Sequence, residues 1–418
     1  MSDLFVRIFW LPRKYSYVSI KDEEVYMEYK FPKFEKIQNY DNSRFYKIKY
    51  LNKSRKLYKQ QKYKESVIFL IKYLNSDILK NVSLKQPSIE VDIQHALAHI
   101  KLNIDDKKVH IRSNIIKINS HNKIVALRKV AEFNFDYFDF AKIVLQDDLL
   151  YIDFEIPLEQ AYPKYLFYCL YEIIYGSDRI IAQLVFKYNI EPLYEIKRLS
   201  NKEEEKVVGY IQNVIDEYES IKQTFREDNK NYYQWDIGVI SLYKLVFCTH
   251  IRGDLYYSIH KTLSVAYDRD MDIVKKIDAI SNFFDKLKKH HNLEQEIYDV
   301  KLAITEREYS DSEIIEEFFK DHKEVIDDYK KNNKNFELSY FSVGVFLRFL
   351  YLYNVSKNYL NPINKLLIKC SNKDATKCSK HARKLFIKLS KADLDSQRVG
   401  FWVSIVVYII LRMYFYKG

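Results

Sequence analysis

The sequence predicts an α+β fold, with the strands in the N-terminal half of the chain and an all-helical C-terminal half. Between residues 89 and 157 apolar residues alternate with polar ones at a period of two, which is typical of half-buried strands. Beyond about residue 200 the apolar period becomes helical. We expect a basic N-terminal extension over 1–62, an α+β domain over 63–198 and an all-helical domain over 199–418.

Composition and charge exclude several classes of protein. The chain of 418 residues is 47% hydrophobic and 30% charged, which excludes a wholly disordered protein. Its 7 Gly and 7 Pro exclude collagen-like and Pro-rich architectures and argue against Gly-rich phosphate loops. The net charge of +11 is concentrated in residues 1–62, with +8, and residues 357–418, with +10. These ends would either meet anionic partners or form a solvated lysine-rich surface.

The N-terminal extension combines short strands with a basic segment. Residues 4–10, 15–20 and 24–30 are aromatic and β-branched, which predicts a small antiparallel meander. Residues 43–62 interleave tyrosines with many lysines, a composition that can bind nucleic acid. In a chain so rich in both residue types, we favour a surface linker or helix, and nucleic acid is the less favoured partner.

The α+β region begins with a helix over residues 64–80 and continues as strands from Ile89. The apolar parity reverses around Gln94-His95, which predicts a bulge or a tight turn. The segment is therefore three strands, or two if one is long and bent. A polar turn is expected at 105–107.

A second helix, a hairpin and a third helix complete this region. Helical spacing returns over 122–133, and Asp147-Asp148 predicts the tight turn of the hairpin. Pro157 ends the last strand, and an amphipathic helix begins after Pro163. We expect one face of the last strand to lie in the core, namely Leu150, Ile152, Phe154 and Ile156.

Short polar loops separate the helices of the C-terminal half. The apolar spacing predicts helices over 202–226, 239–250, 254–267, 271–291, 312–331, 341–355, 362–370 and 374–390, and a last one from Asp393 to the end.

Residues 127–158 resemble a family of bacterial domains. Leu127–Phe135, with the sequence LRKVAEFNF, is similar to the LR-x-VAELNF run of YbjN-like domains. The following AKIVLQDD and YIDFEIPL are similar to the final hairpin of that family. The order of helix, three strands, helix, hairpin and helix is that of type III secretion chaperones. The resemblance covers about residues 63–198 and implies a secretion-chaperone-like α/β sandwich.

The resemblance implies a non-enzymatic chaperone or adaptor that binds a client protein. We expect a component of a bacterial secretion or contractile injection system, and many such chaperones form homodimers. Unlike those small acidic chaperones, this domain is electrically neutral and carries both an extension and a helical half, so no binding residue is transferred. Two alternatives stay open: a nucleic-acid-binding protein that uses the basic termini, and an enzyme of unrecognised class.

We expect no catalytic residue and no cofactor, because no Ser or Cys lies in a nucleophile motif. Cys370, Cys378 and His381 match part of a zinc site but lack a fourth ligand. His95 and His99 are four apart on a predicted strand and therefore share a face, where two imidazoles could bind a metal, but partly exposed or hydrogen-bonded sheet residues are the favoured interpretation. No metal site is therefore expected.

A calcium loop is also excluded by the sequence. Asp268, Asp270 and Asp272 have the spacing of the first calcium ligands of an EF-hand. Ile273 and Ala279 stand where that loop needs glycine and glutamate.

Cysteine usage and the chain start favour a cytoplasmic protein. Four cysteines in 418 residues are too few for a disulfide framework. The first residues lack the charged-then-apolar order of a signal peptide. Membrane association is left open by the segment near the C-terminus.

Residues 400–416 are almost wholly apolar. As a helix they would span about 25 Å, short of a hydrocarbon core of about 30 Å, and Arg412 interrupts them. We favour a helix buried in the helical half, with Trp402, Val406 and Ile409 on its most buried stripe. Contact with a membrane or with a partner protein is the alternative.

Overall fold

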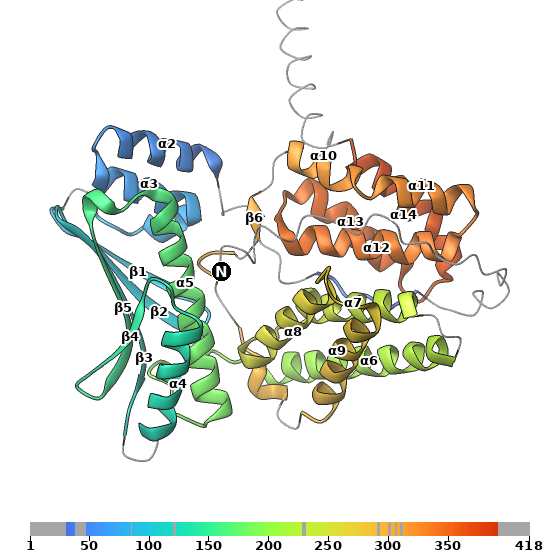
Figure 1. The fold of residues 1–418 in the computed structure, drawn as a ribbon, viewed down its shortest axis with the longest axis horizontal. Helices are drawn as coiled ribbons and strands as arrows, with labels where there is room; N and C mark the ends of the chain where they lie inside the picture. The colour runs from blue at the N-terminus through green and yellow to red at the C-terminus, as the bar shows by residue number, and fades with distance from the viewer. Residues whose placement is uncertain are drawn as a thin grey trace, which may run out of the picture.

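The computed structural model describes residues 31–37, 47–84, 86–119, 123–227, 231–290, 293–299, 302–305, 307–309 and 312–391. It contains a sheet with its helices and, beside them, a helical bundle (Figure 1). Buried apolar residues form two clusters, one centred on the sheet and one on the bundle. The predicted α+β class is therefore confirmed. The meander expected over 4–30 and the segment 400–416 lie outside the described residues.

The antiparallel sheet has the strand order β1-β2-β3-β5-β4. Its strands are β1 (Ile89–His95), β2 (Ala98–Ile104), β3 (Lys108–Lys117), β4 (Lys142–Gln146) and β5 (Leu149–Pro157). β1 and β2 are separate strands joined by a tight turn in which Ala96 has a φ of 49°. Asp147 and Asp148, with φ of 49° and 62°, form the β4–β5 turn, as positive φ at both central residues of a type I′ turn requires. The predicted turns are confirmed.

Helices cover one face of the sheet (Figure 1). They are α2 (Ile48–Lys59), α3 (Tyr63–Asn75) with η3 (Ser76–Leu79), α4 (Lys123–Asp136), and α5 (Pro163–Ala182), which follows η4 (Leu158–Gln160) and continues as η5 (Gln183–Lys187). α5 packs on β2 and β3, whereas α2 packs on α3. Pro163 occupies the first turn of α5, where its missing N–H costs no hydrogen bond.

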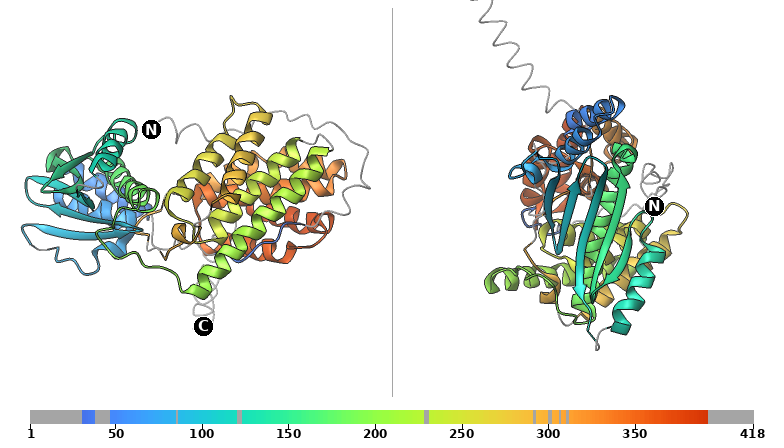
Figure 2. Two further views of the ribbon diagram at one scale, coloured as in Figure 1. Left: turned by 90° about the horizontal axis from the view of Figure 1, so that it is seen from below. Right: turned by 90° about the vertical axis from the view of Figure 1, so that its left-hand side faces the viewer.

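The predicted register of β5 is confirmed. Leu150, Ile152, Phe154 and Ile156 are all buried, and Phe154 pairs with Ile111 across β3. The opposite sheet face is polar, and Figure 2 (right) views the sheet from that side. It carries, for example, an ion pair in which Arg112 Nε lies 3.0 Å from Asp153 Oδ1.

The bundle consists of helices joined mostly by short connections, with the longer stretch 297–311 between η6 and α10. They are α6 (Asn201–Glu227), α7 (Asn231–Cys248), α8 (Gly253–Ala266), α9 (Ile273–Lys288), η6 (Leu293–Glu296), α10 (Ser312–Lys320), α11 (Lys323–Lys331), α12 (Asn335–Leu352), α13 (Lys357–Cys370) and α14 (Ala375–Leu389). Within the described residues, no helix combines the length and apolarity needed to cross a membrane.

Several details of the helical half differ from the sequence prediction, beginning with α7 and α12, which start at Asn231 and Asn335 rather than at residues 239 and 341. The helix expected over 312–331 is two helices, because the chain bends at Asp321-His322, where buried His322 Nδ1 lies 2.7 Å from Phe318 O. α13 begins before Pro362, which was expected to be its first residue, so this proline lies inside the helix. The start of α13 is polar, and apolar spacing therefore did not reveal it. A short parallel strand pair, β6 (Glu308–Tyr309) with β7 (Tyr353–Asn354), lies where only helices were expected.

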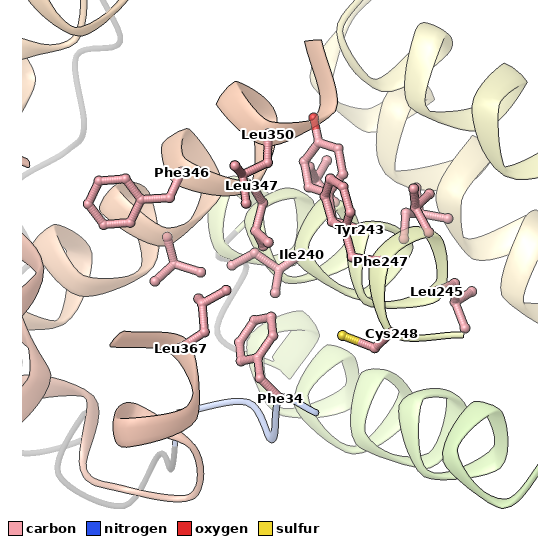
Figure 3. Packing of buried hydrophobic residues seen from close by; sticks show 14 of the residues in the cluster. Phe34, Ile240, Tyr243, Leu245, Phe247, Cys248, Phe346, Leu347, Leu350 and Leu367 are labelled. Atoms are coloured by element: carbon pink, nitrogen blue, oxygen red, sulfur yellow. The ribbon is translucent and has the colours of Figure 1, made fainter. Parts of the chain in front are cut away.

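The two cores exchange segments of the chain. Residues 31–37 pack in the bundle core, where the Phe31 N–H donates to Lys373 O at 2.6 Å. Phe34 points between α7 and α13 (Figure 3). In return, Tyr298, Ala303 and Ile304, which follow η6, are buried in the core of the sheet.

Candidate functional site: an exposed apolar helix face

Helix α4 is apolar on two opposite faces. Its inner face buries Ala126 and Phe133 against the sheet part. Its outer face carries Ile124, Leu127, Ala131 and Phe135, whose spacing of three and four residues aligns them on one stripe. Ile124 is 67% exposed and Phe135 is 90% exposed. We refer to Ile124, Leu127, Ala131 and Phe135 as the α4 face.

The side chain of Asn134 fixes α4 to edge strand β4. Asn134 Nδ2 donates to Ile143 O at 3.0 Å, and Ile143 N–H donates to Asn134 Oδ1 at 2.8 Å. This side-chain amide therefore pairs with the strand as another peptide group would. Since Ile143 is covered in this way, strand addition to β4 is blocked at this point.

A buried carboxylate organises the loop between α4 and β4. Glu172 on α5 accepts the N–H groups of Asp139, Phe140 and Ala141 at 3.0–3.1 Å. Burial raises the pKa of Glu172, and these three N–H groups act in the opposite direction. The loop is thus anchored to α5 immediately after α4 ends.

Close packing on α5 completes the seat of α4. A Cβ at Gly176 would lie 2.5 Å from Phe138 Cε1 and 3.0 Å from Tyr137 Cε1, so only glycine fits there. The Arg179 guanidinium lies 5.8 Å from the centre of the Phe133 ring and 5.0 Å from that of Tyr137. The α4 face is therefore held in a fixed position although its own side chains are exposed.

Replacing Gly176 with alanine is expected to destabilise the protein by about 1–2 kcal/mol. Overpacking against Phe138 costs about 1–3 kcal/mol and outweighs the gain of about 1 kcal/mol from alanine in a helix. Urea denaturation measures the difference. Gly209→Ala on α6 is the matched control, because a Cβ there meets nothing within 4 Å and should stabilise the protein. Equal stability of the two variants would contradict the close packing of Gly176 against Phe138.

A polar site, separate from the α4 face, joins the two parts of the molecule. Buried His95 accepts the N–H of Ala303 at Nδ1, at 3.2 Å. Asn75 Nδ2 donates to Ala303 O at 3.0 Å, and the Tyr175 hydroxyl donates to Ile304 O at 3.3 Å. Side chains of the sheet part thus hold the backbone of the irregular segment 302–305, which follows the bundle helices in the chain.

Two buried carboxyl groups lie at the same junction. Asp178 accepts the Leu97 N–H at 2.9 Å and lies 3.1 Å from the Tyr257 hydroxyl, and burial raises its pKa to about 6. Glu296 accepts the Leu255 N–H at 3.3 Å, and burial raises its pKa to about 7. Shifts of this size also occur at catalytic centres. Here each carboxylate accepts a backbone N–H from its own part of the molecule, and the Tyr257 hydroxyl on α8 links Asp178 to the bundle.

The histidine pair does not share a face. A turn separates His95 on β1 from His99 on β2, and His99 is opposite Gln94 rather than His95. His95 points into the core, whereas the His99 ring stacks on Tyr194 with centroids 3.9 Å apart. The geometric premise of the pair was wrong, because the two-residue turn reverses the strand direction between the histidines.

The cysteine–histidine group is split between core and solvent. Cys370 and Cys378 are both buried, whereas His381 is exposed. Among the described residues, no three His, Cys, Asp or Glu side chains gather as metal ligands would.

The aspartates of the rejected calcium loop have local structural roles. Asp268 Oδ1 accepts the Asp270 N–H at 2.9 Å. Asp272 caps α9 by accepting the Val274 N–H at 2.8 Å. Both carboxylates thus organise the turn that precedes α9.

The sequence shows helical spacing over 122–133, but the prediction did not separate two apolar faces of this helix. The signal was present, because apolar residues at 124, 127, 131 and 135 cannot share a face with 126 and 133. The roles of Asn134, Glu172 and Gly176 depend on contacts 9 to 39 residues away along the chain, and no local pattern reports them.

Comparison with known proteins adds no relative. No protein-family model matches the chain, and no curated protein matches it.

Proposed function

We propose that this protein is a non-enzymatic adaptor or chaperone that binds a partner protein through the α4 face. The observation that carries the proposal is the exposure of Ile124 and Phe135 on a helix whose other face is already buried. An apolar patch on a rigid element is typical of a protein interaction site. Burial of each large side chain would contribute about 1.5–3 kcal/mol to binding.

The α4 face coincides with the run that resembles secretion-chaperone-like domains. Leu127, Ala131 and Phe135 belong to that run, and the inner core does not require them. The order of helix, three strands, helix, hairpin and helix along the chain supports the proposal, because it is the order that the resemblance implies. The proposed partner is a client protein or a component of a bacterial secretion or contractile injection system.

The geometry favours a helical or compact apolar partner segment over an added strand. Asn134 covers the outer hydrogen-bonding groups of Ile143, so fewer backbone groups of β4 can pair with an added strand. A helix with apolar residues at matching spacing would fit against the α4 face.

The test compares full-length protein with the double variant Ile124→Asp/Phe135→Asp. Affinity purification from the native cells, with quantitative mass spectrometry, should show at least a tenfold loss of the specific partner in the variant. Circular dichroism and thermal unfolding should be unchanged, because both side chains are exposed. Val274→Asp, at a 49% exposed position on α9, is the matched control and should retain the partner.

Two outcomes would overturn the proposal. One is an identical set of partners for the wild type and the double variant. The other is a wild-type homodimer, measured by analytical ultracentrifugation, that the double variant abolishes, because a second copy would then occupy the α4 face instead of a client.

A further inference from the structure

Helix α2 presents an uncompensated positive charge to solvent. Residues 47–64 contain eight Lys and Arg and no Asp or Glu. The cations within α2 are all exposed, namely Lys49, Lys53, Arg55, Lys56 and Lys59. Lysines elsewhere do find acidic partners, as Lys64 does with Asp106 at 3.1 Å. Among the described residues, none of the α2 cations forms an ion pair, so their charge is available to an anionic ligand.

Two aromatic rings lie among these cations. Tyr50 on α2 and Phe69 on α3 are half-buried, with ring centroids 6.1 Å apart. Lys49 Nζ lies 5.1 Å from the centre of the Tyr50 ring. Lys53 Nζ and Lys72 Nζ lie 4.3 and 4.8 Å from that of Phe69. These five side chains, with the remaining α2 cations, form what we call the basic–aromatic surface.

The surface is built on a rigid support. Buried Ser54 and Ser66 join α2 to α3, since Ser54 Oγ donates to Ser66 O at 2.7 Å and Ser66 Oγ donates to Ser54 O at 2.9 Å. In Figure 1, α2 lies at the top of the sheet part, on the far side of α3 from the strands. The cations are therefore displayed on a fixed helix and face open solvent.

We propose that the basic–aromatic surface binds single-stranded nucleic acid. Ammonium groups on α2 pair with successive phosphates, which releases counterions. A base stacks on a ring and displaces the lysine that covers it, and such stacking tolerates any base because every base has a π-face. The ligand chemistry is shared by RNA and DNA. This site is separate from the α4 face and does not depend on the proposed function.

The same observations argue against other anionic partners. Helices that insert into a membrane surface offer an apolar face to the lipid. Among the described residues 47–84, no large hydrophobic side chain is exposed, because the apolar side of α2 already packs on α3. An acidic peptide would pair with the cations but would leave Tyr50 and Phe69 without a role.

The test measures the fluorescence anisotropy of labelled oligo(U) and oligo(dT), each of about 15 nucleotides, with full-length protein at several salt concentrations. Both should bind, with a log–log salt slope of about −0.7 for each phosphate that is neutralised. Lys49→Glu/Lys53→Glu/Lys56→Glu should weaken binding more than tenfold at low salt and make the slope shallower. Phe69→Leu keeps an apolar side chain and should weaken binding several-fold with an unchanged slope. A preference for one oligonucleotide identifies RNA or DNA as the source.

Lys261→Glu/Lys275→Glu/Lys365→Glu is the matched control, since these exposed lysines lie apart on α8, α9 and α13 and the change in net charge is the same. This control should retain binding. Equal loss in both triple variants would overturn the proposal, because net charge alone would then account for binding. Binding to phosphatidylglycerol vesicles or polyglutamate, but to neither oligonucleotide, would overturn it as well.

Discussion

Replacing Phe154 with aspartate is expected to unfold the sheet and the helices that cover it. Phe154 is 7% exposed and is opposite Ile111 of the neighbouring strand β3. Its ring centre lies 6.5 Å from that of Tyr165. An unpaired charge at this position costs more than about 4 kcal/mol, a large fraction of the total stability of about 5–15 kcal/mol of a typical protein.

Hydrogen exchange with mass spectrometry measures this effect element by element. In the Phe154→Asp variant, amides of β2, β3 and α5 should lose protection. Glu155→Asp is the control, because Glu155 lies on the polar face of the same strand and the charge is kept. Retained protection of β3 in the Phe154→Asp variant would contradict the packing described for this strand.

Between pH 4.5 and 8, the wild type is expected to lose about 3 kcal/mol of stability relative to Glu296→Gln. Burial raises the pKa of Glu296 from 4.5 to about 7 in the folded state. The folded state therefore binds more protons than the unfolded state in this window, so stability falls as the pH rises. Glutamine does not titrate and retains an oxygen that can accept the Leu255 N–H.

Wild type and Glu296→Gln are compared at each pH, because both proteins carry the same other titratable and charged groups around position 296. Arg252 precedes α8, Asp254 lies in its first turn, and His290 Nε2 lies 3.9 Å from Glu296 Oε1. Buried His95 acts in the opposite direction: its pKa is lowered to about 3, so its stabilising contribution is lost as the pH falls. Urea denaturation at each pH gives the free energies. Parallel pH profiles would contradict the buried, protonated state of Glu296.

The sheet region was predictable because its local patterns agree with its tertiary packing. Alternation placed Leu150 and Phe154 on one face, and paired polar residues at Asp147-Asp148 marked the turn. The helices of the bundle were also found, although α10 and α11 were merged, because apolar spacing continues through the bend at His322.

What the sequence did not predict depends on contacts between distant segments. Asn134 resembles any polar helix residue until β4 lies beside it. The exposure of Phe135 follows from which side of α4 the sheet occupies, and an apolar period alone does not distinguish inner from outer apolar residues. The chaperone or adaptor function, its partner and the non-enzymatic character stay predictions.

The exchange of segments between the two cores has a consequence for synthesis. The sheet core is complete only when Ile304 is available, about 120 residues after α5 ends. At ribosomal rates of about 5–20 residues per second, this delay is on the order of ten seconds. Phe31 gains its backbone hydrogen bond later still, because its partner Lys373 lies near the end of the described chain. A nascent chain thus emerges with both cores unfilled, and a cut between the halves near residue 199 would leave each fragment without a segment that its core requires.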